Sequence, residues 1–217
     1  RNCFVLYSLQ LRKKKILIVT DKGVIRAKLL EEAIASLQQY GFDITIFDKV
    51  MPDPPISLVM ECADLAREKS AEIIFGIGGG SSLDAAKAVS IMVPYKGEIS
   101  DWLGANKVKH PGLAKILVPT TAGTGSELSN ALVLTDDCNG DKIAVSSPYI
   151  FSDLSIIDPV LTLGLPPKIT AESGMDAFSH ALESFLTIKA NPLSDVFSIK
   201  GIEIISKNLR EVYAKGA

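Results

Sequence analysis

The sequence predicts an α/β protein with a parallel sheet in its N-terminal part and helices alone in its C-terminal part. Three observations support this fold class. Short, unbroken apolar runs alternate with stretches of helical apolar spacing as far as about residue 158. Loops rich in glycine or threonine follow two of the apolar runs. After Pro159 the strand-like runs stop, and helical spacing continues to the end of the chain. Such alternation is typical of parallel strands covered by helices.

Short apolar runs predict strands, and the first of them, ILIVT at residues 16–20, has the pattern of a strand buried on both faces. The runs are residues 16–20, 43–47, 72–78 and 115–119, with a further strand within 154–159. Helical spacing predicts helices at residues 24–41, 56–69 and 81–92. The connections are long enough for right-handed crossovers, so we expect a Rossmann-like domain with helices on both faces of its sheet.

Two segments depart from this alternation. Residues 131–135 and 142–147 flank the letters DDCNGD and predict a hairpin with an Asn-Gly turn, and residues 94–112 are expected to form an irregular connection. Beyond Pro159, residues 165–187 and 191–216 predict two helices. We therefore expect a dinucleotide-binding domain at residues 1–158 and the beginning of an all-helical domain at residues 159–217.

Composition excludes several classes of protein. The formal net charge is -2, which gives no support to a nucleic-acid surface or a polybasic membrane patch. No apolar run reaches the ~18 residues that a membrane-spanning helix needs. The three cysteines are far apart in the sequence, which is typical of a reducing compartment, so a cytoplasmic location is expected.

A glycine-rich stretch, FGIGGGSSLDAAKAVS at residues 75–90, joins the third strand to the third helix. Glycine lets backbone N–H groups face a ligand without a Cβ in the way, and a helix N-terminus favours negative charge. Gly78, Gly79, Gly80 and Ser81 therefore predict a diphosphate site. The alternative is a plain glycine turn in which Ser81 or Ser82 caps the helix.

The position of this stretch differs from the usual dinucleotide fingerprint. That fingerprint follows the first strand, with an acidic residue about 20 positions later that binds the ribose. Here the glycines follow the third strand, so a ribose partner is expected from another strand end. Asp21, directly after the first strand, is the candidate, and its carboxylate would favour NAD over NADP by repelling a 2′-phosphate. The alternative is a turn residue before Gly23.

A second polar loop, VPTTAGTGSE at residues 118–127, follows the fourth strand. Its hydroxyls and glycine amides suit the crevice at the carboxyl ends of neighbouring strands, where open α/β sheets bind ligands. The alternative, a polar loop with a helix cap at Ser126, accounts for one hydroxyl of the cluster.

A carboxylate and an imidazole are spaced four residues apart in GMDAFSHALE, at Asp176 and His180. On a helix this spacing places both on one face, within reach of one divalent cation. The alternative is a simple hydrogen-bonded pair. His110, the other histidine, is not expected to be a ligand.

Three motifs in this order, GGGSSLDAAKA, PTTAGTGSE and IIDPVLTLGLPPKITAESGMDAFSHALE, resemble the iron-containing alcohol dehydrogenases. That family includes lactaldehyde reductases, propanediol dehydrogenases and butanol dehydrogenases, and the resemblance runs from about Lys14 to the C-terminus. It implies an α/β dinucleotide-binding domain and a helical domain, with the metal and the nicotinamide in a cleft between them.

The resemblance also implies site residues, NAD as cofactor, and Fe²⁺ or Zn²⁺ as the metal. Asp176 and His180 match the first two metal ligands, and no catalytic side chain is assigned. At Asp53 many members of the family have Asn. The implied cofactor-binding residues are Asp21, Asp53, Gly78, Gly79, Gly80, Ser81, Asp84, Thr120, Thr121, Thr124 and Lys142.

The chain also departs from the family. It ends at Ala217, before the two further histidine ligands, and RNCFVLYSLQLR replaces the usual first strand, so we expect a fragment. The implied function is a metal-dependent alcohol dehydrogenase that transfers hydride between an alcohol and its aldehyde or ketone and NAD(P). The alternative is a catalytically inactive nucleotide-binding fragment of such an enzyme. A lyase or a glycerol-type dehydrogenase on the same fold is a third reading.

The truncation has a consequence for packing. Apolar side chains of the last helices, including Phe178, Phe185 and Ile204, would lack their partners. Exposed apolar patches of this kind mark association surfaces. We therefore expect a homodimer or a higher oligomer, with a small alcohol or aldehyde as the substrate.

Overall fold

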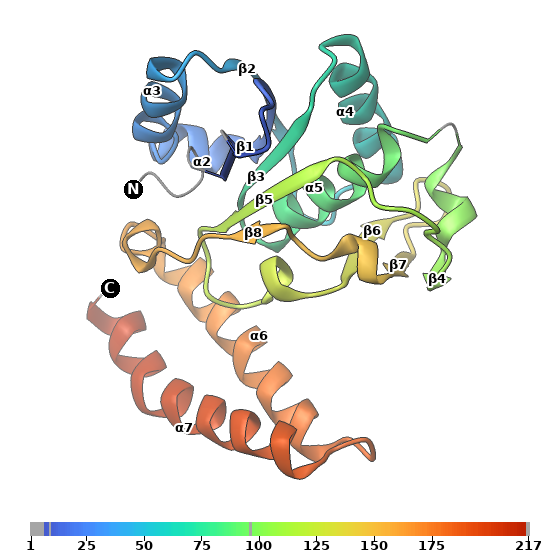
Figure 1. Ribbon diagram of the computed structural model, residues 1–217. Helices are drawn as coiled ribbons and strands as arrows, with labels where there is room; N and C mark the ends of the chain where they lie inside the picture. Colours follow the sequence, from blue (N-terminus) through green and yellow to red (C-terminus); the bar gives the residue numbers. More distant parts are fainter. Residues whose placement is uncertain (1–6, 9, 96, 216–217) are drawn as a thin grey trace. The chain divides into compact units, whose positions relative to one another are not determined.

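The computed structural model describes residues 7, 8, 10–95 and 97–215 (Figure 1). It divides into two compact units. The first comprises Arg1–Pro119 and Ser126–Ile157, and the second comprises Thr120–Gly125 and Asp158–Ala217. The chain therefore leaves the first unit for six residues after Pro119 and leaves it again at Asp158.

The first unit is built on a parallel five-stranded sheet in the order β2-β1-β3-β5-β8. This Rossmann-like sheet confirms the predicted fold class. The last strand is shorter than the sequence predicts. The strands are β1 (Lys15–Asp21), β2 (Asp43–Val50), β3 (Ile73–Gly78), β5 (Ala114–Pro119) and β8 (Leu154–Ser155).

The helices of this unit include α2 (Lys22–Arg26), α3 (Glu31–Gln39), α4 (Ile56–Glu68) and α5 (Gly80–Met92). The prediction of one helix at residues 24–41 is wrong, because two helices occupy that stretch. Lys28, between them, has a φ of 59°, a left-handed conformation that interrupts the helical ladder. Apolar spacing alone gives no sign of this break.

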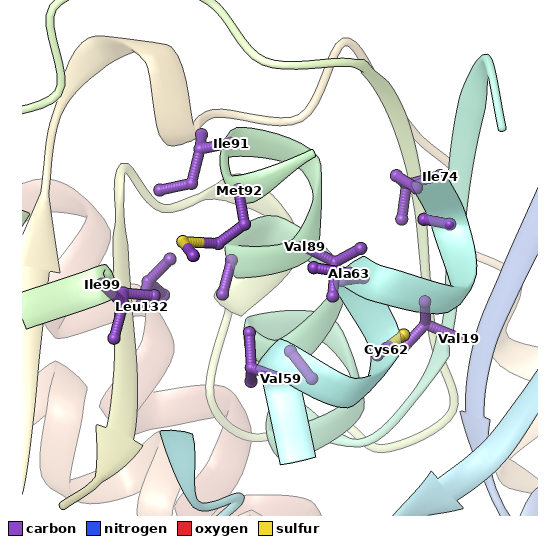
Figure 2. Close-up of a cluster of buried hydrophobic side chains, with 14 of the residues drawn as sticks. Val19, Val59, Cys62, Ala63, Ile74, Val89, Ile91, Met92, Ile99 and Leu132 are labelled. Carbon is purple, nitrogen blue, oxygen red and sulfur yellow. The ribbon is translucent and has the colours of Figure 1, made fainter. Parts of the chain in front are cut away.

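The core of the unit lies between one face of the sheet and the helices α4 and α5. Val19 and Ile74 point from the sheet into this cluster, and Val59 and Val89 meet them from the two helices (Figure 2). The alternate residues of the strands are buried as well, as expected for a parallel sheet covered on both faces. Burial on both faces therefore explains the continuous apolar runs of the sequence.

A second, three-stranded sheet has the order β4-β7-β6. β6 (Ala131–Thr135) and β7 (Lys142–Ser146) form the predicted antiparallel hairpin, and Gly140 turns it with a φ of 76°. The stretch predicted to be irregular contains a 3₁₀ helix at Ile99–Trp102 and β4 (Gly104–Ala105), which pairs with β7. Further 3₁₀ turns lie at Ser126–Leu128 and Pro148–Ile150.

Besides the segment Thr120–Gly125, the second unit contains a 3₁₀ turn at Pro159–Thr162 and two long helices, α6 (Pro167–Leu186) and α7 (Pro192–Lys215). Small residues let the helices approach closely: a Cβ on Gly174 would lie 2.3 Å from Leu209 Cδ1. Many apolar side chains of the pair are nevertheless exposed, among them Phe185 and Ile204. Across the described part of the chain, no helix is both long and apolar enough to cross a membrane.

Candidate functional site

The order of the large sheet defines where a ligand would bind. The chain runs from β1 outward to β2 and then returns to β3 on the other side of β1. Open α/β sheets bind ligands at the carboxyl ends of the strands where the order reverses in this way. β1 ends at Asp21 and β3 ends at Gly78, so these two predicted residues flank that point. Thr20 Oγ1 donates a hydrogen bond to Ile77 O at 2.8 Å and ties the two strand ends together.

The first turn of α5 keeps its backbone amides available. Its N-cap residue is Gly79, which has no side chain to accept a hydrogen bond from the first amides of the helix. Both serines have other partners: Ser81 Oγ accepts from Asp53 N at 3.3 Å, and Ser82 Oγ donates to Asp21 Oδ2 at 3.1 Å. The alternative of a serine-capped helix is therefore wrong. Ser82 N donates to Gly79 O at 3.0 Å, and the amides before it, together with the helix dipole, favour an anion at such a terminus.

Gly78 is required by its conformation and by its surroundings. Its φ is +148°, which side chains rarely adopt. A Cβ there would lie 2.6 Å from Ser82 Oγ and 3.0 Å from Asp21 Oδ2. The turn thus brings bare backbone directly against the carboxylate at the end of β1.

Asp21 begins α2. Its Oδ1 accepts hydrogen bonds from Gly23 N at 2.7 Å and Val24 N at 3.1 Å, so it is the N-cap of that helix. These bonds give Asp21 a local structural role, as a helix cap rather than as the turn residue of the alternative reading. Its Oδ2 accepts from Ser82, and a carboxylate offers about four acceptor positions. The carboxylate therefore keeps capacity for a further donor, and its contact with a ribose stays a prediction.

Three of the predicted cofactor residues meet near the start of α5. Lys142 Nζ forms an ion pair with Asp53 Oδ1, and Asp53 N donates to Ser81. Asp53 has a φ of 55°, a conformation that Asp tolerates better than most residues. The pair is largely exposed to solvent, so its contribution to stability is small. It places one cation and one carboxylate next to the glycine turn.

Asp84 belongs to a buried network on the side of α5. Its Oδ1 accepts from Ser126 Oγ at 2.5 Å and lies 3.2 Å from Lys87 Nζ, and its Oδ2 accepts from Val133 N at 2.9 Å. Lys87 is fully buried, and its Nζ also donates to Ala131 O at 2.5 Å. Burial lowers the pKa of Lys87, while the Asp84 carboxylate opposes that shift.

The threonine loop, Thr120–Gly125, carries Thr120, Thr121 and Thr124 and groups with the second unit. A Cβ on Gly123 would lie 2.8 Å from Ser173 O of α6, so this loop packs closely on that helix. Asp176 follows Ser173 by one helical turn. The loop therefore packs on α6 about one helical turn from Asp176.

Asp176 and His180 lie on α6 with Oδ1 and Nε2 3.6 Å apart, too far for a hydrogen bond. Their side chains are 41% and 54% exposed, so both remain accessible to an ion. Among the described residues, no group of three or more His, Cys, Asp or Glu is placed to hold a metal. His110 instead stacks on Tyr95 at 6.2 Å between ring centroids.

Sequence reasoning missed the residues that hold these loops in place. Thr20 and Lys87 make contacts between elements described above, and Ser82 and Ser126 were considered only as helix caps. Lys87 had a recognisable signal, because it stands within the apolar run AAKAV, three residues after Asp84. A buried lysine needs a partner, and that spacing supplies one.

Comparison with protein families agrees with this arrangement. Residues 6–159 match the family described as iron-containing alcohol dehydrogenase, and residues 170–217 match the C-terminal part of the Fe-containing alcohol dehydrogenase family. The chain belongs to the iron-containing alcohol dehydrogenase family.

Curated relatives and solved structures extend the comparison. The sulfoacetaldehyde reductase of Bilophila wadsworthia is 41% identical over 95% of this chain and 53% of its own length. A solved 1,3-propanediol oxidoreductase superposes with a TM-score of 0.93 at 33% identity, over 98% of this chain and 56% of its own. A sulfoacetaldehyde reductase of Bifidobacterium kashiwanohense, solved in complex with NAD⁺, gives 0.86 at 30% identity, over 97% and 56% of the two chains. The chain thus spans about half the length of the relatives it matches.

Proposed function

We propose that this chain is the cofactor-binding part, with two metal ligands, of an alcohol dehydrogenase that uses NAD and a divalent cation. The substrate is the couple of a primary or secondary alcohol and its aldehyde or ketone. The names of the relatives share this couple and differ in the rest of the substrate, such as sulfoacetaldehyde, 1,3-propanediol and long-chain alcohols.

The observation that carries the proposal is the uncapped first turn of α5 at the reversal point of the sheet. A diphosphate accepts hydrogen bonds from amides in such a turn and is favoured by the helix dipole. Glycine at position 78 lets the main chain approach, and the Asp21 carboxylate stands directly beside it. One relative of known structure is a complex with NAD⁺, which supports the same ligand class here.

The residues around this turn suggest roles toward the cofactor. Gly79, Gly80 and Ser81 would hold the diphosphate with their amides. Asp21 would accept from ribose hydroxyls and exclude a 2′-phosphate, which favours NAD over NADP. Lys142, beside the turn, would hold a ribose hydroxyl, and the threonine hydroxyls of Thr120–Gly125 would orient the nicotinamide.

Asp176 and His180 fit a divalent cation, because a carboxylate and an imidazole on one helical face suit Fe²⁺ or Zn²⁺. They would supply half of a four-ligand set. When bound, nicotinamide exchanges hydride and the cation acts as a Lewis acid on the substrate oxygen. The protein contributes position and orientation, and no side chain of this chain is assigned as the base.

A second reading is that the chain binds the nucleotide without turnover. This reading is favoured by the metal ligands, because the described residues place no third ligand beside Asp176 and His180. Partial coordination weakens metal affinity strongly. Aldehyde reduction by this chain with NADH and Fe²⁺ or Zn²⁺ would overturn this second reading.

Titration of the chain with NADH, followed by fluorescence anisotropy, tests the proposed cofactor site. Gly78→Ala places a Cβ in the turn and is expected to weaken binding by at least about tenfold. Gly41→Ala is the matched control, because Gly41 also has a positive φ of 72°, but a Cβ added there would meet no described heavy atom within 4 Å. Equal affinity of both variants and the unmodified chain would reject the site.

A further inference from the structure

The buried network on α5 holds one end of the threonine loop, Thr120–Gly125. Ser126 follows this loop immediately, is itself buried, and donates its hydroxyl to Asp84 Oδ1 at 2.5 Å. The other end is fixed by the sheet, because Pro119 pairs with Gly78 where β5 lies beside β3. Both ends of the loop are therefore attached to the segment that forms the glycine turn and α5.

Each charged atom of the Asp84–Lys87 pair has at least one partner. The three hydrogens of the Lys87 ammonium face Asp84 Oδ1 at 3.2 Å, Ala131 O at 2.5 Å and Ser129 Oγ at 3.2 Å. Asp84 accepts in addition from Val133 N at 2.9 Å. A fully satisfied buried network is rigid, whereas a half-satisfied one is costly. The Asp84 and Lys87 side chains are thus held in place on α5.

The bond from Ser126 is not needed to neutralise this pair. Lys87 already faces the same oxygen, and the hairpin strand β6 is joined to Asp84 through Val133. The Ser126 hydroxyl adds a separate link, from the pair to the end of the threonine loop. Hydrogen bonds to a buried charged acceptor are short and strong, so this link restricts the loop before any ligand arrives.

We propose that Asp84 and Lys87 form a clamp that, through the hydroxyl of Ser126, holds the threonine loop in its cofactor-binding conformation. The proposal rests on the proposed function, because the loop is taken to contact the cofactor. Asp84, Lys87 and Ser126 are positioning residues in it. A loop that is already ordered loses less conformational freedom on binding, which strengthens affinity without a new contact. On this view Asp84 acts on the cofactor indirectly.

Ser126→Ala tests the clamp with the least damage, since it leaves Asp84 and Lys87 paired. It is expected to weaken NADH binding about tenfold and to accelerate amide hydrogen exchange of residues 121–125 in the absence of NADH. Ser126→Thr retains the hydroxyl and is expected to restore both properties. The control is Ser90→Ala, which removes a buried hydroxyl of α5 that donates to Lys87 O at 2.8 Å.

The outcomes separate the clamp from the proposed function. Unchanged exchange and unchanged affinity in Ser126→Ala, or equal losses in Ser90→Ala, would overturn the clamp while NADH binding by the unmodified chain stands. Absence of NADH binding by the unmodified chain would overturn the proposed cofactor role instead. The exchange measurement then still decides whether the hydroxyl orders the loop.

Discussion

Gly76→Ala probes the close packing of α5 on the sheet, on which the position of the glycine turn depends. A Cβ at Gly76 would lie 2.6 Å from Ala86 Cβ and 2.8 Å from Leu117 Cδ2. Carbon atoms in ordinary contact are ~3.5–4.0 Å apart, so α5 would have to retreat by about 1 Å. Overpacking of this kind typically costs about 1–3 kcal/mol, and Ala86 Cβ cannot rotate away. We expect the free energy of unfolding to fall by about 2 kcal/mol.

A double-mutant cycle with Ala86→Gly isolates that contact. Ala86→Gly alone should cost about 1 kcal/mol, because glycine is unfavourable inside a helix. In the double variant the Ala86 Cβ is gone and Leu117 can adjust. The loss of stability measured for the double variant should therefore be clearly smaller than the sum of the losses of the two single variants. The assay is urea unfolding followed by circular dichroism. Additivity within about 0.5 kcal/mol would refute the reasoning.

Two further predictions concern pH and association. Backbone hydrogen bonds from Lys14 N and Lys15 N hold the pKa of Glu72 below its usual value. A carboxylate with a lowered folded-state pKa stabilises the fold above its unfolded pKa and loses that contribution as the pH falls through the folded value. Glu72→Gln should therefore flatten the loss of stability on acidification, by a small amount because the group is exposed; equally steep acid unfolding of both proteins would contradict it. The side chains of Ile188 and Phe197 are 101% and 70% exposed, so the chain should sediment as a dimer or larger and shift toward monomer in Phe197→Glu. A clean monomer of the unmodified chain would count against that expectation.

Much of the fold follows from elementary features of the sequence. Strands β1, β3 and β5 are buried on both faces, so they are unbroken apolar runs that cannot be mistaken for amphipathic elements. The helical break at Lys28 could not be predicted, because a left-handed residue leaves the apolar spacing unchanged. The two-residue strand at Gly104–Ala105 is too short to carry a pattern.

The candidate site was also predicted only in part. The glycine and threonine loops were predicted because their residue types are unusual at strand ends. The contacts that hold these loops in place were not predicted. Lys87 had a sequence signal that was overlooked, whereas the bond from Ser126 to Asp84 depends on a side-chain contact that residue type does not reveal. That the glycine turn and Asp176 face one cleft stays a prediction of the sequence.

The most direct test of the central claim is the backbone amide spectrum of the ¹⁵N-labelled chain during addition of NADH or ADP-ribose. Both ligands carry the diphosphate, and ADP-ribose lacks the nicotinamide. The account predicts that the amide signals of Gly79, Gly80 and Ser81 shift most, and to a similar extent with either ligand. Saturable shifts confined to other parts of the chain, or none at millimolar ligand, would contradict it.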